Sequence, residues 1–180
     1  LARFWLTAPE KGLYELDLTH GMFAFYRDHA RSFESMAAFA NAGFNLTGSG
    51  EPERLTGTNV TSGFLTVFAV KPMLGRDFLP AEDTRGNNLV TLISYGLWQR
   101  RFAGDSAIVG RAISLNEIPT VVVGVMPPDF DYPKGTDLWV PLGLDSTSLG
   151  SWYLSAIGRL RSGVSPDVAA RDIAALNGRF

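Results

Sequence analysis

The chain has 180 residues, of which 46% are hydrophobic and 19% are charged, a composition typical of a folded globular domain rather than a disordered segment. The net charge of −2 gives no overall basic character, so we expect neither nucleic acid nor an anionic membrane surface to be attracted by the chain as a whole. The chain has no cysteine, which excludes disulfides, thiolate metal sites and cysteine nucleophiles and leaves the compartment open. No signal peptide is visible, and no apolar run approaches the roughly 18–20 residues of a membrane span.

The first part of the chain is predicted to contain a strand and a helix. Residues 1–7 (LARFWLT) form a strand-like run, and Pro9 and Gly12 predict a loop after it. Thr19 is a suitable N-cap for a helix over about residues 20–32. One face of this helix carries, at helical spacing, Met22, Phe25, Tyr26 and His29.

Two strands are then predicted around a glycine-rich corner. Residues 35–48 and 53–62 are β-prone, and Gly48, Gly50 and Pro52 suit a tight turn between these two strands. The corner does not match a phosphate-binding loop, since it has neither a lysine nor a following helix. We therefore predict a purely architectural role for it.

A short apolar helix is predicted over residues 62–70, with Phe64 and Phe68 one turn apart. Two roles are open for these rings. They either anchor the helix to a sheet or line a surface for an apolar ligand or a partner helix. Phe64 and Phe68 are therefore the candidate residues of an apolar partner or ligand surface.

The following segment is predicted to be rich in strands. Residues 89–94 form a buried-looking strand, after which Ser94 caps a short helix. Residues 110–127 predict a β-hairpin with its turn at Asn116 and Glu117.

The last part returns to a strand followed by a helix. Residues 137–142 (DLWVPL) predict a short edge strand, because Pro141 lacks an N–H group. A strand is predicted over residues 152–160, and then a helix with Ser165 as N-cap and Pro166 as its first residue. Elements of β-α-β type at both ends thus flank a β-rich middle, which favours an α+β fold with an inserted subdomain.

Ser94 lies in a strand-to-helix turn that partly mimics a nucleophile elbow. The motif G-x-S-x-G requires glycine two residues before the serine, and Leu92 takes that place here. In that fold the histidine follows the serine, whereas the histidines of this chain are His20 and His29. We predict that Ser94 is a helix cap, and a serine hydrolase that uses it stays an alternative.

No metal site, cofactor or catalytic residue is predicted. His20 and His29 are spaced neither three nor four residues apart, so one helix face does not bring them together. The neighbouring Arg100 and Arg101 are predicted to lie on a solvated helix face. The paired acids are predicted to be turn and surface residues: Glu51 and Glu53, Glu82 and Asp83, Asp129 and Asp131.

Two long stretches resemble the MacB-like periplasmic core domain of ABC-transporter permeases of the MacB/FtsX type. Residues 25–78 (FYRDHARSFESM to KPMLGRDF) resemble the first half of that domain. Residues 92–130 (LISYGLWQRRF to VMPPDF), followed by DLWVPL, resemble its second half. Both halves occur in the family's order and spacing, and the likeness extends over nearly the whole chain.

The resemblance implies a porter-like β-α-β subdomain, which we assign to residues 1–70 and 151–180, and an inserted small β-rich subdomain over residues 71–150. The second β-α-β unit is expected to be truncated before its last strand, which would leave an exposed sheet edge. Many relatives have Asn-Gly at the hairpin turn. This chain has Asn116 and Glu117 there, which leaves the turn geometry open.

The resemblance also implies a function. Such domains lie between two transmembrane helices of a bacterial inner-membrane permease, outside this segment, and project into the periplasm. They transmit ATP-driven movement without catalysis, in efflux or in lipoprotein or peptide export. The implied partners are a cytoplasmic ABC ATPase, a second permease copy and a periplasmic adaptor protein. A freestanding ligand- or lipid-binding module is the main alternative.

Overall fold

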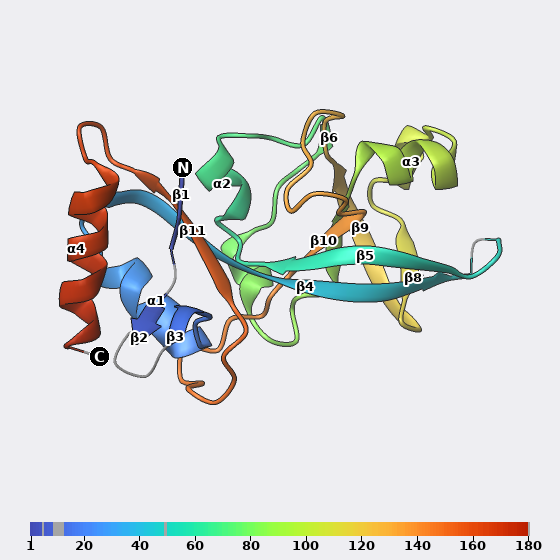
Figure 1. Cartoon of the computed structure of the whole chain (residues 1–180). Helices are drawn as coiled ribbons and strands as arrows, with labels where there is room; N and C mark the ends of the chain where they lie inside the picture. Colours follow the sequence, from blue (N-terminus) through green and yellow to red (C-terminus); the bar gives the residue numbers. More distant parts are fainter. Residues whose placement is uncertain (5, 9–12, 49, 180) are drawn as a thin grey trace.

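The computed structural model describes residues 1–4, 6–8, 13–48 and 50–179. Its fold is α+β, as predicted, with four α-helices on one large sheet (Figure 1). The helices are α1 His20–His29, α2 Phe64–Phe68, α3 Tyr95–Phe102 and α4 Pro166–Asn177, with the 3-10 helices η2 Pro80–Asp83 and η3 Ser106–Ile108. The strands are β1 Ala2–Phe4, β2 Leu6–Ala8, β3 Leu13–Leu16, β4 Phe33–Thr47, β5 Glu53–Val60, β6 Leu74–Gly75, β7 Val90–Ile93, β8 Ala112–Leu115, β9 Ile118–Val125, β10 Leu138–Pro141 and β11 Ser155–Leu160. The predicted loop at Pro9 and Gly12 lies outside the described residues.

Serine and threonine side chains begin three of the helices, as predicted. The N–H groups of the third helical residues donate to Thr19 Oγ1 at 3.2 Å, to Ser94 Oγ at 3.1 Å and to Ser165 Oγ at 3.4 Å. Helix α1 is shorter than predicted, because the backbone at Ala30 is already extended and β4 begins at Phe33.

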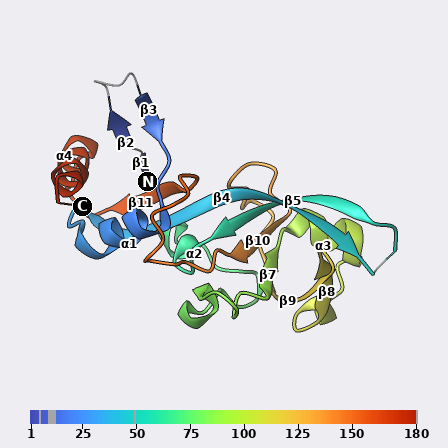
Figure 2. The same cartoon turned by 90° about the horizontal axis from the view of Figure 1, so that it is seen from below.

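The large sheet has nine strands among the described residues. Its order is β1-β11-β4-β5-β10-β7-β9-β6, and β8 pairs with both β4 and β9. Strand β1 is outermost on the side of α1 and α4. Strands β2 and β3 form a separate hairpin that stands away from the body (Figure 2).

Strand β4 runs through both halves of the molecule. Its first residues pair antiparallel with β11, from Phe33 to Phe39, and its later residues pair with β5, from Phe39 to Leu46. Leu46 and Thr47 also pair with β8. Figure 1 shows α1 and α4 at one end of this strand and α3 with β8 and β9 at the other, which we call the distal end.

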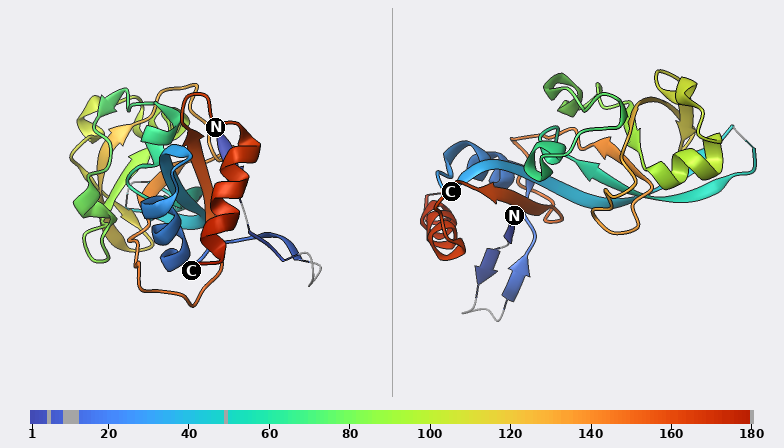
Figure 3. Two further views of the ribbon diagram at one scale, coloured as in Figure 1. Left: turned by 90° about the vertical axis from the view of Figure 1, so that its left-hand side faces the viewer. Right: turned by 90° about the horizontal axis from the view of Figure 1, so that it is seen from above.

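The core has three parts, and β4 contributes to all of them. On one sheet face α1 and α4 cover the even-numbered Met36, Ala38 and Ala40, and Figure 3 shows these two helices side by side. The odd-numbered Ala37 and Phe39 point to the opposite face, toward α2. A third cluster at the distal end packs α3 and η3 against β4, β5, β7, β8, β9 and β10. It consists of Leu46, Leu55, Ile93, Leu97, Trp98, Ile108, Ile113, Leu115, Val122, Val125, Leu138 and Val140.

The prediction that residues 137–142 form an edge strand is wrong. Strand β10 lies inside the sheet, parallel to β5 and antiparallel to β7, and all four of its residues are buried. Pro141 is compatible with this place because the pairing with β7 involves only Leu138 and Trp139, so the missing N–H removes no bond to β7.

Both predicted turns are present. At the corner after β4, Gly48 and Gly50 have φ values of 81° and 85°, which glycine adopts without steric cost. At the β8–β9 turn, Asn116 and Glu117 have φ values of 50° and 67°, as in a type I′ turn, so the departure from Asn-Gly keeps the usual geometry. The corner lies at the distal end. Next to it, Thr47 Oγ1 donates to Ser114 Oγ at 3.0 Å, so the corner also neighbours the segment assigned to the inserted subdomain. The subdomain boundaries stay a prediction, and β4 contributes residues to all three core clusters.

Candidate functional site: the charged junction of β5, α3 and β10

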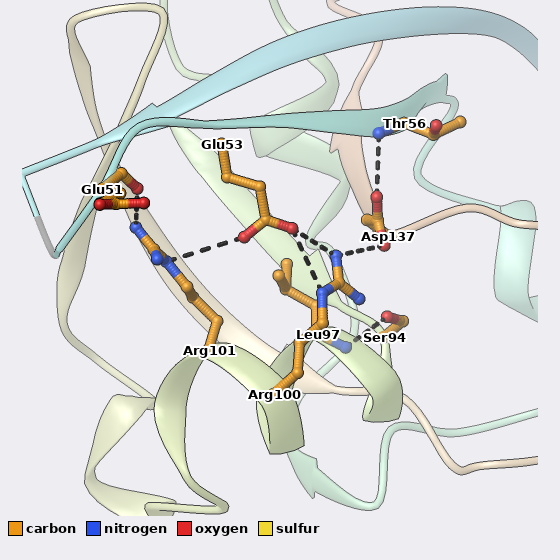
Figure 4. Close-up of polar contacts among 8 residues, drawn as sticks. All are labelled: Glu51, Glu53, Thr56, Ser94, Leu97, Arg100, Arg101 and Asp137. Atoms are coloured by element: carbon orange, nitrogen blue, oxygen red, sulfur yellow. Dashed lines mark hydrogen bonds and ion pairs between the residues drawn. The ribbon is translucent and has the colours of Figure 1, made fainter.

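Four charged side chains join helix α3 to the hairpin of β4 and β5 at the distal end (Figure 4). We call this group the charged junction; it consists of Glu53, Arg100, Arg101 and Asp137. Glu53 is the first residue of β5, and Asp137 directly precedes β10. Both arginines lie in the last turn of α3, where positive charge complements the negative end of the helix dipole.

Arg100 is the centre of the junction. Its Nη2 donates to Glu53 Oε1 and to Asp137 Oδ1, each at 2.9 Å, and its Nε donates to Glu53 Oε1 at 3.2 Å. Burial lowers the pKa of the Arg100 guanidinium, but the hydrogen bonds to the two carboxylates outweigh it and raise this pKa above its ordinary value. The guanidinium therefore stays charged and links two chain segments to α3.

Arg101 adds a second link to the same hairpin. Its Nη2 donates to the main-chain oxygen of Glu51, and its Nε lies 3.8 Å from Glu53 Oε2. This Nε is buried and has no hydrogen-bond partner among the described residues.

Asp137 ties the junction to the main chain. Its Oδ2 accepts from the Thr56 N–H at 3.0 Å, and its main-chain oxygen accepts from the Ser94 N–H at 2.8 Å. Its own N–H donates to the Thr56 oxygen at 2.7 Å. The start of α3, the start of β10 and the middle of β5 are therefore fixed to one another.

Arg100 is exposed, as predicted for a solvated helix face, whereas Arg101 is partly buried, and the sequence did not predict the ion pairs that both form. Their partners lie 47 and 37 residues from Arg100 in the chain, so no local spacing pointed to the junction. The two carboxylates are engaged by guanidinium groups, and that of Asp137 also by the Thr56 N–H. The chemistry of the junction is that of a rigid connection.

The chain was compared with known families. The MacB-like periplasmic core domain matches residues 10–176. The chain belongs to this family. A comparison with curated protein sequences gives no match.

Three solved structures share the fold of this MacB-like domain. The periplasmic region of MacB from Actinobacillus actinomycetemcomitans has a TM-score of 0.72 at 14% identity, covering 97% of this chain and 80% of that one. A domain of a permease protein from Porphyromonas gingivalis has a TM-score of 0.68 at 20% identity, covering 91% and 71%. The extracellular domain of the noncanonic ABC-type transporter YknZ from Gram-positive bacteria has a TM-score of 0.64 at 18% identity, covering 98% and 93%. These are transporter domains rather than enzymes.

No helix in the described part of this MacB-like domain has the length and apolar character of a membrane span. Ser94 is the N-cap of α3, and within the described residues neither histidine contacts it. His20 Nδ1 accepts from the Asp145 N–H at 3.0 Å, and His29 Nδ1 contacts the Phe25 oxygen at 2.8 Å. No group of acids and histidines suited to a metal ion occurs in the described part of the chain.

Phe64 and Phe68 lie in the core that α2 forms with the sheet. Phe64 is 1% exposed, and its ring packs on Phe39 and Phe68 at centroid distances of 5.9 and 5.2 Å. Phe68 is half-buried and contacts Phe130 and Tyr132 at 5.3 and 4.9 Å. This packing is that of anchoring residues. An apolar ligand surface here stays a prediction that depends on Phe68.

Proposed function

We propose that this domain transmits ATP-driven conformational change, without catalysis, in an ABC-transporter permease of the bacterial inner membrane. It would face the periplasm and contact partner proteins during efflux or lipoprotein or peptide export. The proposed partners are a cytoplasmic ABC ATPase, a second permease copy and a periplasmic adaptor protein.

The observation that carries the proposal is the strand β4. Its 15 residues extend roughly 45–50 Å at about 3.3 Å per residue, from the core under α1 and α4 to the distal end. Strand β4 is hydrogen-bonded along its whole length, to β11 up to Phe39 and to β5 from Phe39 onward. A continuously paired strand resists bending, so a displacement at one end moves the other end as well. The charged junction supports the same role, because it fixes α3 to the tip of this strand pair.

The location is tested first, in intact cells that make the full-length permease. Because the chain has no cysteine, a single Ala107→Cys at an exposed position gives a unique label site within it. We expect a membrane-impermeant maleimide to label it from outside. The matched control is Ala38→Cys, which is 0% exposed and should stay unlabelled in the folded domain. Labelling of Ala107→Cys only after permeabilisation would contradict the location.

Transmission is tested with spin labels in the permease reconstituted with its ATPase. The distance between the Ala107→Cys labels of two copies should change when ATP turnover is trapped with vanadate. The distance within one copy between Ala107→Cys and Ser151→Cys should stay constant, because we propose that the domain moves as a rigid body. A change within the copy and none between copies would refute the proposal.

A further inference from the structure

We propose that the end of the domain opposite the charged junction binds a phosphate group between Arg31, Arg161 and Arg179. A hollow of about 410 Å³ lies there, beside the C-terminal ends of α1 and α4. Its lining consists of Asp28, His29, Ala30, Arg31, Arg161 and Arg179. We call it the arginine hollow.

Hydrogen bonds hold the Arg161 guanidinium and the backbone of Arg31 in the arginine hollow. Arg161 Nε donates to the Arg31 oxygen at 2.9 Å, and the Arg161 N–H donates to the Ser32 oxygen at 3.0 Å. The N–H groups of Arg31 and Ser32 both donate to Asp172 Oδ2 of α4 at 2.8 Å. The turn after α1 is therefore pinned to α4, and the Arg161 guanidinium is held by one nitrogen while its two terminal nitrogens are left for another acceptor.

In the described residues, the guanidinium groups of the arginine hollow form no salt bridge, although the negative charge of Asp172 interacts with the positive charge of Arg31 from outside the lining. Across the described ranges, no carboxylate forms a salt bridge with Arg31, Arg161 or Arg179. The single acid in the lining, Asp28, pairs with Arg27 at 2.8 Å. A chain of net charge −2 thus concentrates cations at one place, which the overall charge did not predict.

The helix dipoles explain two of the three arginines in the hollow but not the third. Arginines near helix C-termini complement the negative ends of the dipoles, which accounts for Arg31 after α1 and Arg179 after α4. Arg161 belongs to neither helix and follows β11. Three guanidinium groups from three separate segments match the several oxygens of a phosphate, which accept paired hydrogen bonds from arginine.

The phosphate could belong to a phospholipid head group or to a soluble anion. Both present the same phosphate oxygens to the guanidinium groups. The proposal therefore concerns the phosphate, and the experiments below distinguish the two sources. The head group as a source rests on the proposed membrane location, whereas phosphate binding itself does not.

The test uses the isotope-labelled 180-residue chain, titrated with inorganic phosphate in about 0.15 M salt while amide chemical shifts are recorded. We expect saturable shifts at Arg31, Ser32 and Arg161. Arg161→Gln should weaken binding by about tenfold, because it removes charge-assisted hydrogen bonds. Combining it with Arg31→Gln should abolish binding.

The matched control is Arg171→Gln, which removes an exposed positive charge from α4 outside the arginine hollow. It should change the affinity by less than about twofold, since long-range surface charge is screened at this salt concentration. Thermal unfolding by circular dichroism verifies that each variant is folded. Absence of saturable shifts in the wild type, or equal losses in Arg161→Gln and Arg171→Gln, would overturn the proposal.

Vesicles separate the two sources of phosphate. Sedimentation of the wild type with phosphatidylglycerol vesicles, but not with phosphatidylcholine vesicles, and its loss in Arg31→Gln/Arg161→Gln would identify a lipid head group. Phosphate binding without sedimentation would identify a soluble anion. Either result is independent of the maleimide labelling, so failure of the site and failure of the proposed location are distinguishable.

Discussion

Removing the Arg100 guanidinium should loosen helix α3 from strand β5 while the rest of the domain stays folded. The side chains of Arg100, Glu53 and Asp137 are 46%, 31% and 20% exposed. Exposed ion pairs contribute about 0.2–1 kcal/mol, and bonds to better buried charged groups about 1.5–3 kcal/mol. Since this junction is partly exposed, we expect Arg100→Gln to lower the free energy of unfolding by about 1–2 kcal/mol.

Double-mutant cycles with urea unfolding measure this effect pair by pair. Asp137→Asn and Glu53→Gln each combine with Arg100→Gln, and we expect coupling energies of about 0.5–1 kcal/mol that shrink in about 1 M salt. Hydrogen exchange should rise in residues 95–102 and not in α1. Arg27→Gln, which removes the more exposed pair with Asp28, is the control and should cost less than about 0.5 kcal/mol. Couplings near zero for both pairs, or a uniform rise in exchange, would refute the mechanical role of the junction.

Three further predictions concern single residues. Glu117→Gly should raise the free energy of unfolding, measured in urea, by about 0.5–1 kcal/mol, because glycine adopts the φ of 67° without strain. The control is Glu117→Ala, which keeps the strain. An equal gain in both variants would argue against this cause. Burial lowers the pKa of His20 below 6.5, with Asp145 and Asp83 opposing the effect, so the unfolded chain binds more protons and stability is lost as pH falls through the folded pKa. Between about pH 7.5 and pH 5, the free energy of unfolding of the wild type should therefore fall more than that of His20→Gln. If the urea midpoints of the two proteins change by the same amount over this range, His20 does not have this role. Ser94→Ala should cost about 1 kcal/mol whereas Ser94→Asp should not, since only the cap to Leu97 is lost; disappearance of a measurable esterase activity would instead favour the hydrolase alternative.

Local signals explain why much of the fold was predictable from the sequence. Thr19, Ser94 and Ser165 mark helix starts because a cap acts on an N–H only three residues away. The β8–β9 turn follows from two apolar runs separated by two residues. Caps and tight turns depend on a few consecutive residues, and the structure confirms the three caps and the β8–β9 turn.

Pairing between distant segments could not be predicted in the same way. Strand β10 has only four residues, and Pro141 favoured an edge. Its interior place depends on β5 on one side and β7 on the other, and neither is adjacent in the chain. The charged junction and the arginine hollow have the same origin: each assembles side chains that only the sheet topology brings together.

The two ends of β4 therefore have different chemistry on one rigid element. At its start, Ser32 precedes the strand and Arg161 follows the partner strand β11, and their main chains are hydrogen-bonded at 3.0 Å. A phosphate bound between Arg31 and Arg161 would link the start of β4 to the end of β11, and so stabilise this end of the strand pair. At the far end, Arg100 fixes α3 to β5. A ligand at the arginine hollow and a partner at α3 would then be connected through paired strands rather than through a flexible hinge. Phosphate binding should therefore leave the distance between the Ala107→Cys and Ser151→Cys labels within one copy unchanged.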